Sequence, residues 1–246
     1  MAIYGISDLH LSLTEYFSEE ILNCCDEHKP MHIFGAHWEN HTRKIFENWN
    51  SAVSASDTVL VPGDLSWAMH MKDAVYDFDF LSRLQGRLLI CRGNHDYWWD
   101  TKAKICQALP ENVIPLQNES FLAENVVISA TRGWICPGSK DFKAGDEKIY
   151  RRELIRLEMA LQHGKKLQEQ TEAVSEHWVM LHYRPTNDEF SESGFTELMQ
   201  KYGVTRCFYG HLHGNPCYNV LQGERFGIDF QLLSCDYLHF KPLKLK

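Results

Sequence analysis

The sequence contains no pair of cysteines with C-x-x-C spacing, although eight cysteines are scattered along its 246 residues. Several of them fall inside apolar runs of strand length, where a thiol packs as a small hydrophobic side chain. This pattern indicates a reducing compartment and excludes the disulfide framework of a small secreted domain. We therefore expect a cytoplasmic protein.

Long apolar runs and basic blocks are also missing. No segment approaches the roughly 20 apolar residues of a membrane-spanning helix, and no basic region precedes an apolar stretch at the amino terminus. The formal net charge is −8 without any cluster of lysine and arginine, which disfavours an extended nucleic-acid track but permits a phosphate pocket. With 44% hydrophobic residues, the chain can bury the core of one large domain over residues 1–246.

Polar side chains follow five apolar runs at the point where each run ends. In the clearest case, Leu88 to Cys91 leads through Gly93 to Asn94, His95 and Asp96. Glycine permits a sharp turn, and ligands of open α/β sheets bind beyond the carboxyl ends of the strands. The other runs are 3–7, 58–61, 178–181 and 207–209, followed by Asp8, His10, Asp64, His182, His211 and His213. One such residue alone can be an ordinary turn former, but five runs with one layout indicate a shared site.

The remaining pattern is that of an α/β protein. Residues 41–55 and 71–84 each carry an apolar stripe at helical spacing between successive runs, which predicts parallel strands with right-handed crossovers. Residues 98–108 also have a helical pattern. Histidines crowd residues 28 to 41 without regular spacing, which favours surface or packing roles over a second metal site. They are His28, His32, His37 and His41.

The second half of the chain predicts short strands, a long helix and a loop. We expect strands within 113–129, a charged helix over 146–170 interrupted at Gly164, and closing antiparallel strands at 218–221, 226–228 and 231–233. The loop 132–145 either flanks the substrate or forms a solvated connection. Residues 240–246 are expected to be a solvated tail rather than a membrane anchor.

The polar residues form an ordered set of motifs. They are Asp8-Leu9-His10, Gly63-Asp64, Gly93-Asn94-His95-Asp96, His182 and Gly210-His211-Leu212-His213. The set resembles D-x-H, G-D, G-N-H-D/E, H and G-H-x-H of the calcineurin-like metallophosphoesterase superfamily, in order and over nearly the whole chain. Leu-Ser-Trp follows Asp64 where the serine/threonine phosphatases carry D-R-G, which disfavours a protein phosphatase. The resemblance implies a four-layer α/β/β/α sandwich with two mixed sheets flanked by helices.

The resemblance also implies a dinuclear metal centre in which Asp64 bridges two divalent ions. One ion would be held by Asp8, His10, Asp64 and His213, and the other by Asp64, Asn94, His182 and His211. Imidazole and carboxylate ligands suit Mn, Fe, Zn or Ni, whereas the lack of a thiolate argues against a structural zinc site.

The chemistry implied by this centre is hydrolysis of a phosphomonoester or phosphodiester by in-line attack of a metal-bridging hydroxide. His95 would act as general acid, and the adjacent Asp96 could orient it and raise its pKa. Arg92 and Arg184 lie beside motif residues and could clamp the phosphate, with a structural salt bridge as the alternative for each.

We expect a small or medium phosphorylated substrate, and two related enzymes remain as alternatives. A nuclease of the superfamily should carry a basic track or a further domain, and neither is visible. A nucleotide-lipid pyrophosphatase is similar in size and in an amino-terminal D-L-H-L, and should carry an exposed apolar cap with a basic rim. An inactive scaffold that binds proteins belongs to a different class. The presence of every ligand and of His95 disfavours it.

Overall fold

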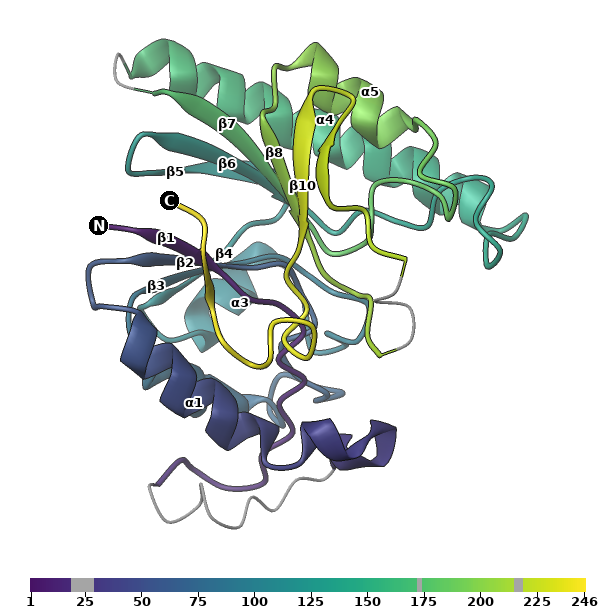
Figure 1. Cartoon of the computed structure of the whole chain (residues 1–246). Coiled ribbons are helices and arrows are strands. Elements are labelled where there is room, and N and C mark those ends of the chain that lie inside the picture. Colours follow the sequence, from purple (N-terminus) through teal and green to yellow (C-terminus); the bar gives the residue numbers. More distant parts are fainter. Residues whose placement is uncertain (19–28, 172–173, 215–218) are drawn as a thin grey trace. The chain divides into compact units, whose positions relative to one another are not determined.

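The computed structural model describes residues 1–18, 29–171, 174–214 and 219–246 (Figure 1). The chain divides into two compact units, of which unit 1 comprises Met1–Pro115 with Leu233–Lys246 and unit 2 comprises Leu116–Leu232. Each unit contains one mixed β-sheet and its own helices. The expected α/β fold with two mixed sheets flanked by helices is therefore confirmed, while the single domain stays a prediction. Within the described residues, every helix is too short or too polar to cross a bilayer.

Unit 1 is built on a five-stranded sheet. Its strands are, in spatial order, β11 (Leu243–Lys244), β1 (Ile3–Gly5), β2 (Thr58–Val61), β3 (Arg87–Ile90) and β4 (Val113–Pro115). The first four strands in chain order are parallel, as the alternation of strand and helix predicted. All residues of β2 are buried, which explains its continuous apolar sequence.

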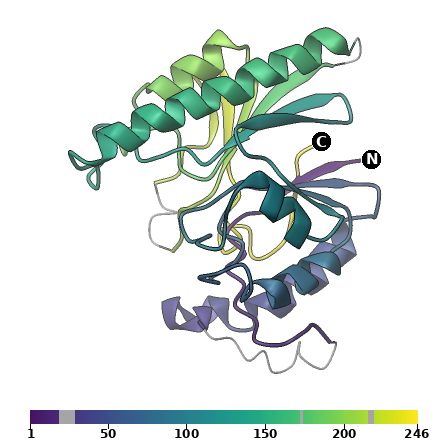
Figure 2. The same ribbon diagram turned by 180° about the vertical axis from the view of Figure 1, so that it is seen from behind.

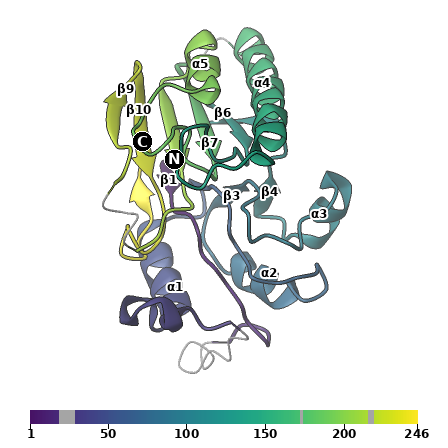
Figure 3. The same cartoon turned by 90° about the vertical axis from the view of Figure 1, so that its right-hand side faces the viewer.

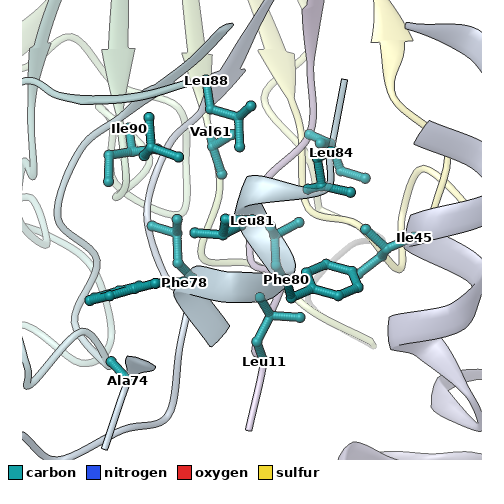
Figure 4. Packing of buried hydrophobic residues seen from close by; sticks show 14 of the residues in the cluster. Leu11, Ile45, Val61, Ala74, Phe78, Phe80, Leu81, Leu84, Leu88 and Ile90 are labelled. Carbon is teal, nitrogen blue, oxygen red and sulfur yellow. The ribbon is translucent and has the colours of Figure 1, made fainter. Parts of the chain in front are cut away.

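The helices of unit 1 supply the apolar side chains of its core. They are α1 (His41–Ala52), α2 (Val75–Ser82) and α3 (Lys102–Ala108), with two short 3-10 helices, η2 (Met31–Phe34) and η3 (Ala36–Trp38). Phe78 and Leu81 of α2 and Ile45 of α1 are buried in one cluster with Val61 and Leu88 of the sheet (Figure 4). The helical stripes of the sequence therefore face the sheet.

The carboxyl terminus is part of the sheet of unit 1, so the expectation of a solvated tail is wrong. Strand β11 pairs antiparallel with β1, placing Leu243 beside Gly5. Phe240, at the start of this segment, is 4% exposed and lies in the core. The pairing satisfies backbone groups along the outer edge of β1 that would otherwise need water.

Unit 2 is built on a six-stranded sheet. Its strands are, in spatial order, β5 (Glu119–Ala123), β6 (Val126–Thr131), β7 (Glu176–Leu181), β8 (Arg206–Tyr209), β10 (Ile228–Leu232) and β9 (Gly223–Arg225). The four inner strands are parallel and the two edge strands are antiparallel. Helices α4 (Asp146–Gln170) and α5 (Gly194–Lys201) lie on one face of this sheet, as the views in Figures 2 and 3 show.

Three local expectations in unit 2 are wrong. Residues 219–221, the described part of the strand expected at 218–221, form no strand. Helix α4 runs without interruption through Gly164, which is buried against the sheet. The strand expected at 226–228 begins only at Ile228, because Phe226 and Gly227 form the turn between β9 and β10 with φ of 56° and 72°. Positive φ at both central residues suits a tight hairpin turn.

Candidate functional site

Three candidate ligands of unit 1 have an unusual backbone conformation. Asp8 and His10 follow β1, Asp64 follows β2, and their φ angles are 60°, 47° and 52°. His211 of unit 2 shares this left-handed conformation, with φ of 73°. Such angles are uncommon for residues other than glycine and concentrate at functional sites, where the surrounding structure holds them in place. Four of the residues that the sequence singled out are thus held in less favourable backbone conformations.

The carboxylate of Asp8 is fully buried and held by hydroxyl groups. Ser7 Oγ donates to Asp8 Oδ2, and Ser234 Oγ donates to the same oxygen at 3.0 Å. Ser234 belongs to the segment that re-enters unit 1 after β10, where it forms a β-bridge with Ser7. Nothing in the sequence around Ser234 marks it as a neighbour of the site, because the contact joins residues 226 positions apart.

Asp64 is buried like Asp8, and two residues of the predicted motifs lie next to its carboxylate. His10 Nε2 lies 3.9 Å from Asp64 Oδ2, and the backbone N–H of His95 donates to Asp64 Oδ1 at 2.8 Å. Gly93 makes this arrangement possible. A Cβ atom at that position would lie 2.0 Å from Asp64 Oδ1 and 2.3 Å from its backbone nitrogen. The glycine of the G-N-H-D motif therefore provides space for the carboxylate of the preceding motif.

Asp96 joins two of the motif loops. Its fully buried carboxylate accepts hydrogen bonds at 2.8 to 3.3 Å, none of them from the imidazole of His95 within the described residues. The donors are the backbone N–H groups of Gly93, Asp64, Leu65 and Ser66 and the indole of Trp98. Burial raises the pKa of Asp96 to about 6, and the N–H donors oppose that shift. The structure thus places Asp96 where it positions Asp64, while its proposed action on His95 stays a prediction.

An aromatic side chain that sequence analysis passed over lies against two motif histidines. The ring of Trp67 is stacked on His10, with centroids 4.8 Å apart, and its centroid lies 4.1 Å from that of His95. Lys29 Nζ lies 3.2 Å from the centroid of the same indole. The sequence offered one signal for Trp67, namely an aromatic residue three positions after Asp64. In the structure, the backbone N–H of Trp67 donates to the carbonyl of Leu11.

The two arginines differ in their surroundings. Arg92 Nε is buried and has no hydrogen-bond partner among the residues that the structure describes. Arg184 contacts Asp188 Oδ1 at 2.5 Å and also donates to the backbone oxygens of Thr186 and Asn219. The salt bridge left open for both residues is present for Arg184, and the phosphate-clamp role of each stays a prediction.

Unit 2 presents its predicted histidines at the ends of β7 and β8. His182 is fully buried, its N–H donates to Arg132 O at 3.0 Å, and its ring centroid lies 5.0 Å from that of His211. The ring of Tyr183 lies 4.3 Å from His211 and was not predicted. His213 follows two residues later and is partly exposed, as is Asn94 in unit 1.

The histidines at 32, 37 and 41 do not belong to this set. His41 is 1% exposed and packs against Trp38 and Phe240, and burial lowers its pKa to about 4. Among the described residues, none of these histidines belongs to a group that could hold a metal. The packing role is thereby favoured for His41, while His28 lies outside the described residues.

The residues present fit divalent transition metals. Among the described residues, the candidate metal ligands combine aspartate and histidine without a thiolate. They are Asp8, His10 and Asp64 in unit 1 and His182, His211 and His213 in unit 2. Carboxylate oxygen and imidazole nitrogen are the ligands that manganese, iron, zinc and nickel accept. The buried hydroxyl groups on Asp8 supply the outer hydrogen bonds that commonly orient a metal-binding carboxylate.

Comparison with known proteins identifies the class. A sequence model of calcineurin-like phosphoesterases matches residues 1–215, so the chain belongs to this family, as its motifs indicated. A search of curated proteins gave no match.

Three of the solved structures that are similar to the chain are described here by their identity and coverage. A protein of unknown function, AQ665 from Aquifex aeolicus, is 15% identical with a TM-score of 0.48, over 99% of this chain and 95% of that one. Phosphopantetheinyl hydrolase (PptH) from Mycobacterium tuberculosis is 13% identical with a TM-score of 0.49 and the same coverage. TT1561 from Thermus thermophilus is 11% identical with a TM-score of 0.46, over 86% of this chain and 81% of that one.

Proposed function

We propose that the protein is a metal-dependent phosphoesterase that hydrolyses a small or medium phosphomonoester or phosphodiester with two divalent metal ions. The observation that carries this proposal is the complete set of family motif residues, with Asp8, His10, Asp64 and His211 held in left-handed backbone conformations at strand ends. Backbone in sparsely populated conformations clusters at active sites and ligand clamps, which favours an active centre over a scaffold.

The proposed ligands follow the family motifs. Asp8, His10 and His213 would serve one ion, His182, His211 and Asn94 the other, and Asp64 both. When bound, such ions polarise water and neutralise the charge of phosphoryl oxygens. Asp64 is suited to a shared position because Gly93 leaves room for its carboxylate and the His95 N–H fixes one oxygen.

Proton transfer to the leaving oxygen is assigned to His95. Its ring contacts Trp67, with centroids 4.1 Å apart, and the His10 centroid lies 5.7 Å away. The indole limits the positions that the imidazole can take, so that a proton can be delivered from a fixed direction. Arg92 has a buried Nε without a partner among the described residues and is the better candidate of the two arginines to contact phosphate.

The test compares wild type with Asp64→Asn and His95→Asn on an alkyl phosphate and on p-nitrophenyl phosphate, with Mn²⁺ and with the metal content of each protein measured. We expect wild type to bind two ions and to hydrolyse both esters. Asp64→Asn should lose both ions. His95→Asn should keep its metal and lose roughly 10²- to 10⁴-fold in kcat/KM on the alkyl ester, the usual value of general acid catalysis, and far less on p-nitrophenyl phosphate, whose leaving group needs little protonation.

Other outcomes identify the alternatives. Equal losses on both esters in fully metallated His95→Asn would remove the general-acid role. A diester, a nucleotide-lipid pyrophosphate and single-stranded DNA complete the substrate panel, and cleavage of only one of these would favour the corresponding enzyme. Two bound metals without any hydrolysis would favour the inactive scaffold.

We also propose a cytoplasmic location. The cysteines that the structure describes carry free thiols, and four of the five are buried, where they pack as small apolar side chains. Such thiols persist in a reducing compartment.

A further inference from the structure

Four side chains of unit 1 form a continuous row of contacts at the candidate site. Lys29 Nζ lies 3.2 Å from the centroid of the Trp67 ring, and the Trp67 ring lies 4.1 Å from that of His95. Tyr97 is the next residue in the row, with its ring centroid 6.2 Å from that of His95. The row therefore connects a cation and a phenol ring through the side chain that is assigned to proton transfer.

The position of Lys29 is fixed at both its backbone and its side chain. Its carbonyl accepts a hydrogen bond from the fully buried Ser12 Oγ at 3.1 Å. Its ammonium lies against Trp67, whose indole N–H donates to Met31 Sδ at 3.2 Å and whose ring is stacked on His10. A cation that is held in place before a ligand binds lowers the cost of binding.

The ammonium of Lys29 keeps hydrogen-bond donors for a ligand. Among the residues that the structure describes, it forms no ion pair, and its contact is with the ring of Trp67. An aromatic face attracts the charge but does not satisfy all three donors of an ammonium group. Lys29 is partly exposed, so an anionic group can reach it.

Tyr97 is an exposed aromatic residue beside the proposed proton donor. It is 49% exposed, whereas the following Trp98 and Trp99 are buried. The backbone N–H of Tyr97 donates to the carbonyl of His95 at 2.8 Å in a tight turn, which keeps the two residues together. Core packing does not account for the Tyr97 ring, and an exposed ring of this kind can stack on a planar ligand group.

The proton donor defines which part of the substrate these groups meet. A general acid lies within hydrogen-bond reach of the leaving oxygen, so the side chains next to His95 face the leaving group. His95 is itself partly exposed, so this approach is open. A leaving group with a negative charge can bind the ammonium of Lys29, and one with a planar ring can stack on Tyr97. A simple alkyl alcohol would use neither.

We infer that Lys29 and Tyr97 form the subsite for the leaving group, and that they select a leaving group that carries a negative charge and a planar ring, the chemistry of a nucleoside monophosphate. This inference rests on the proposed function, because it takes His95 as the proton donor. Lys29 recognises the charge and Tyr97 recognises the ring, so both are specificity-determining residues of the proposed reaction.

The first test measures kcat/KM, with Mn²⁺, for four phosphomonoesters whose alcohols differ in charge and in the presence of a ring. They are n-butyl phosphate with neither feature, phosphoglycolate with the charge, adenosine 5′-monophosphate with the ring, and adenosine 3′,5′-bisphosphate with both. Loss of either phosphate from the bisphosphate releases an alcohol that bears a ring and a phosphate. We expect each feature to raise kcat/KM and the bisphosphate to be the preferred substrate.

Substitutions separate the two contributions. Lys29→Met removes the ammonium and should reduce the preference for charged leaving groups roughly 10-fold or more, the effect of a hydrogen bond to a charged group. Tyr97→Leu should reduce the preference for the ring roughly 5-fold or more, the effect of stacking on an aromatic side chain, and Tyr97→Phe should retain it. The matched controls Lys241→Met and Tyr16→Leu replace exposed residues of unit 1 and should keep both preferences.

The second test needs neither metal nor hydrolysis. The metal-free full chain with isotope-labelled tryptophan is titrated with adenosine 5′-monophosphate, adenosine and 1-butanol. We expect a saturable shift of the Trp67 indole signal with the nucleotide, at a lower concentration than with adenosine, and no shift with butanol. Lys29→Met should bind the nucleotide no better than adenosine, at an unchanged melting temperature.

The outcomes distinguish the subsite from the proposed function. Hydrolysis of all four esters without preference, or wild-type preferences in both Lys29→Met and Tyr97→Leu, would overturn the subsite while the phosphoesterase stands. Saturable binding of the nucleotide that Lys29→Met weakens, without hydrolysis of any ester, would support the subsite and overturn the proposed function.

Discussion

At the scale of single residues, the candidate site depends on close approach as much as on chemistry. Asp64, Gly93 and Asp96 form one connected arrangement in which Gly93 yields space to the Asp64 carboxylate and its N–H donates to Asp96. The Asp96 carboxylate in turn accepts from the backbone N–H of Asp64 at 3.0 Å. A substitution at Gly93 should therefore displace the carboxylate of Asp64, although it replaces none of the proposed metal ligands.

We predict that Gly93→Ala loses metal and activity. The added methyl group would have to displace Asp64 Oδ1, which lies 2.0 Å from the Cβ position. A shift of about 1 Å in a reacting group can cost roughly 10²-fold in rate, and overpacking of this kind typically costs about 1 to 3 kcal/mol of stability. Activity, metal content and melting temperature should be measured together.

Gly145→Ala is the matched control, since nothing lies within 4 Å of a Cβ at that position and its φ is −70°. Wild-type activity and metal content in this variant are expected. A Gly93→Ala protein with full metal content and activity would show that Asp64 can move without consequence, contrary to the assignment of its carboxylate.

The sequence predicted the candidate metal ligands better than the residues that contact and position them. Asp8, Asp64 and His182 were recognisable because each follows an apolar strand, a pattern visible over a few positions. Trp67 and Ser234 were not, since their importance arises from contacts between distant segments. The buried, unpartnered hydroxyl of Thr186 likewise appears only after folding.

At the scale of elements, helix α4 meets its sheet through a buried polar network. Ser129 Oγ of β6 lies 2.7 Å from His177 Nε2 of β7, and Ser120 Oγ of β5 donates to the carbonyl of Ala160 in α4 at 2.7 Å. A Cβ on Gly164 would lie 2.7 Å from His177 Nε2, so the glycine allows the helix to approach. This explains why Gly164 does not break the helix.

We predict that His177 makes unit 2 less stable in acid. Burial lowers its pKa from 6.5 to about 4, so the unfolded chain binds the proton more readily than the folded one. The stability that depends on neutral His177 is full above pH 6.5 and is lost as the pH falls toward 4. Neutral His177 contributes roughly 3 kcal/mol to the free energy of unfolding, and about 2 kcal/mol of this contribution is lost by pH 5. Urea unfolding followed by circular dichroism at pH 7 and pH 5 measures it.

The control variants separate this group from other histidines. His177→Asn can still bond to Ser129 without titrating and should reduce the difference between the two pH values. His70→Asn replaces an exposed histidine and should behave as wild type. The pKa of His41 is also lowered to about 4, so His41 will account for part of the pH dependence that remains in His177→Asn. An unchanged pH dependence in His177→Asn would contradict the prediction.

Local pattern predicted most elements but missed those decided by partners elsewhere in the chain. The parallel strands of unit 1 and the long helix α4 followed from periodicity over many residues. Strand β11 was missed because a two-residue strand has no pattern of its own and forms only through pairing with β1. The turn at Phe226 and Gly227 was mistaken for strand because an aromatic residue normally favours strands.

At the scale of the whole molecule, the proposed function distributes the metal ligands over both compact units. Asp8, His10 and Asp64 belong to unit 1, and His182 and His211 belong to unit 2. Each unit has its own sheet and forms a compact body of its own. Metal binding would then connect the stability of one unit to that of the other.

We predict that metal slows amide exchange in both units together. A ligand that binds only the folded state stabilises it by RT ln(1 + [L]/Kd), about 2.7 kcal/mol at a concentration of 100 Kd, and both units supply ligands to each proposed ion. Hydrogen exchange followed by mass spectrometry, on chelator-treated protein with and without Mn²⁺, should show slower exchange in peptides covering β2 of unit 1 and β7 of unit 2. Asp64→Asn lies in unit 1 and should nevertheless abolish the effect in β7. Protection confined to one unit would contradict the shared assignment of ligands, even if that unit bound metal tightly.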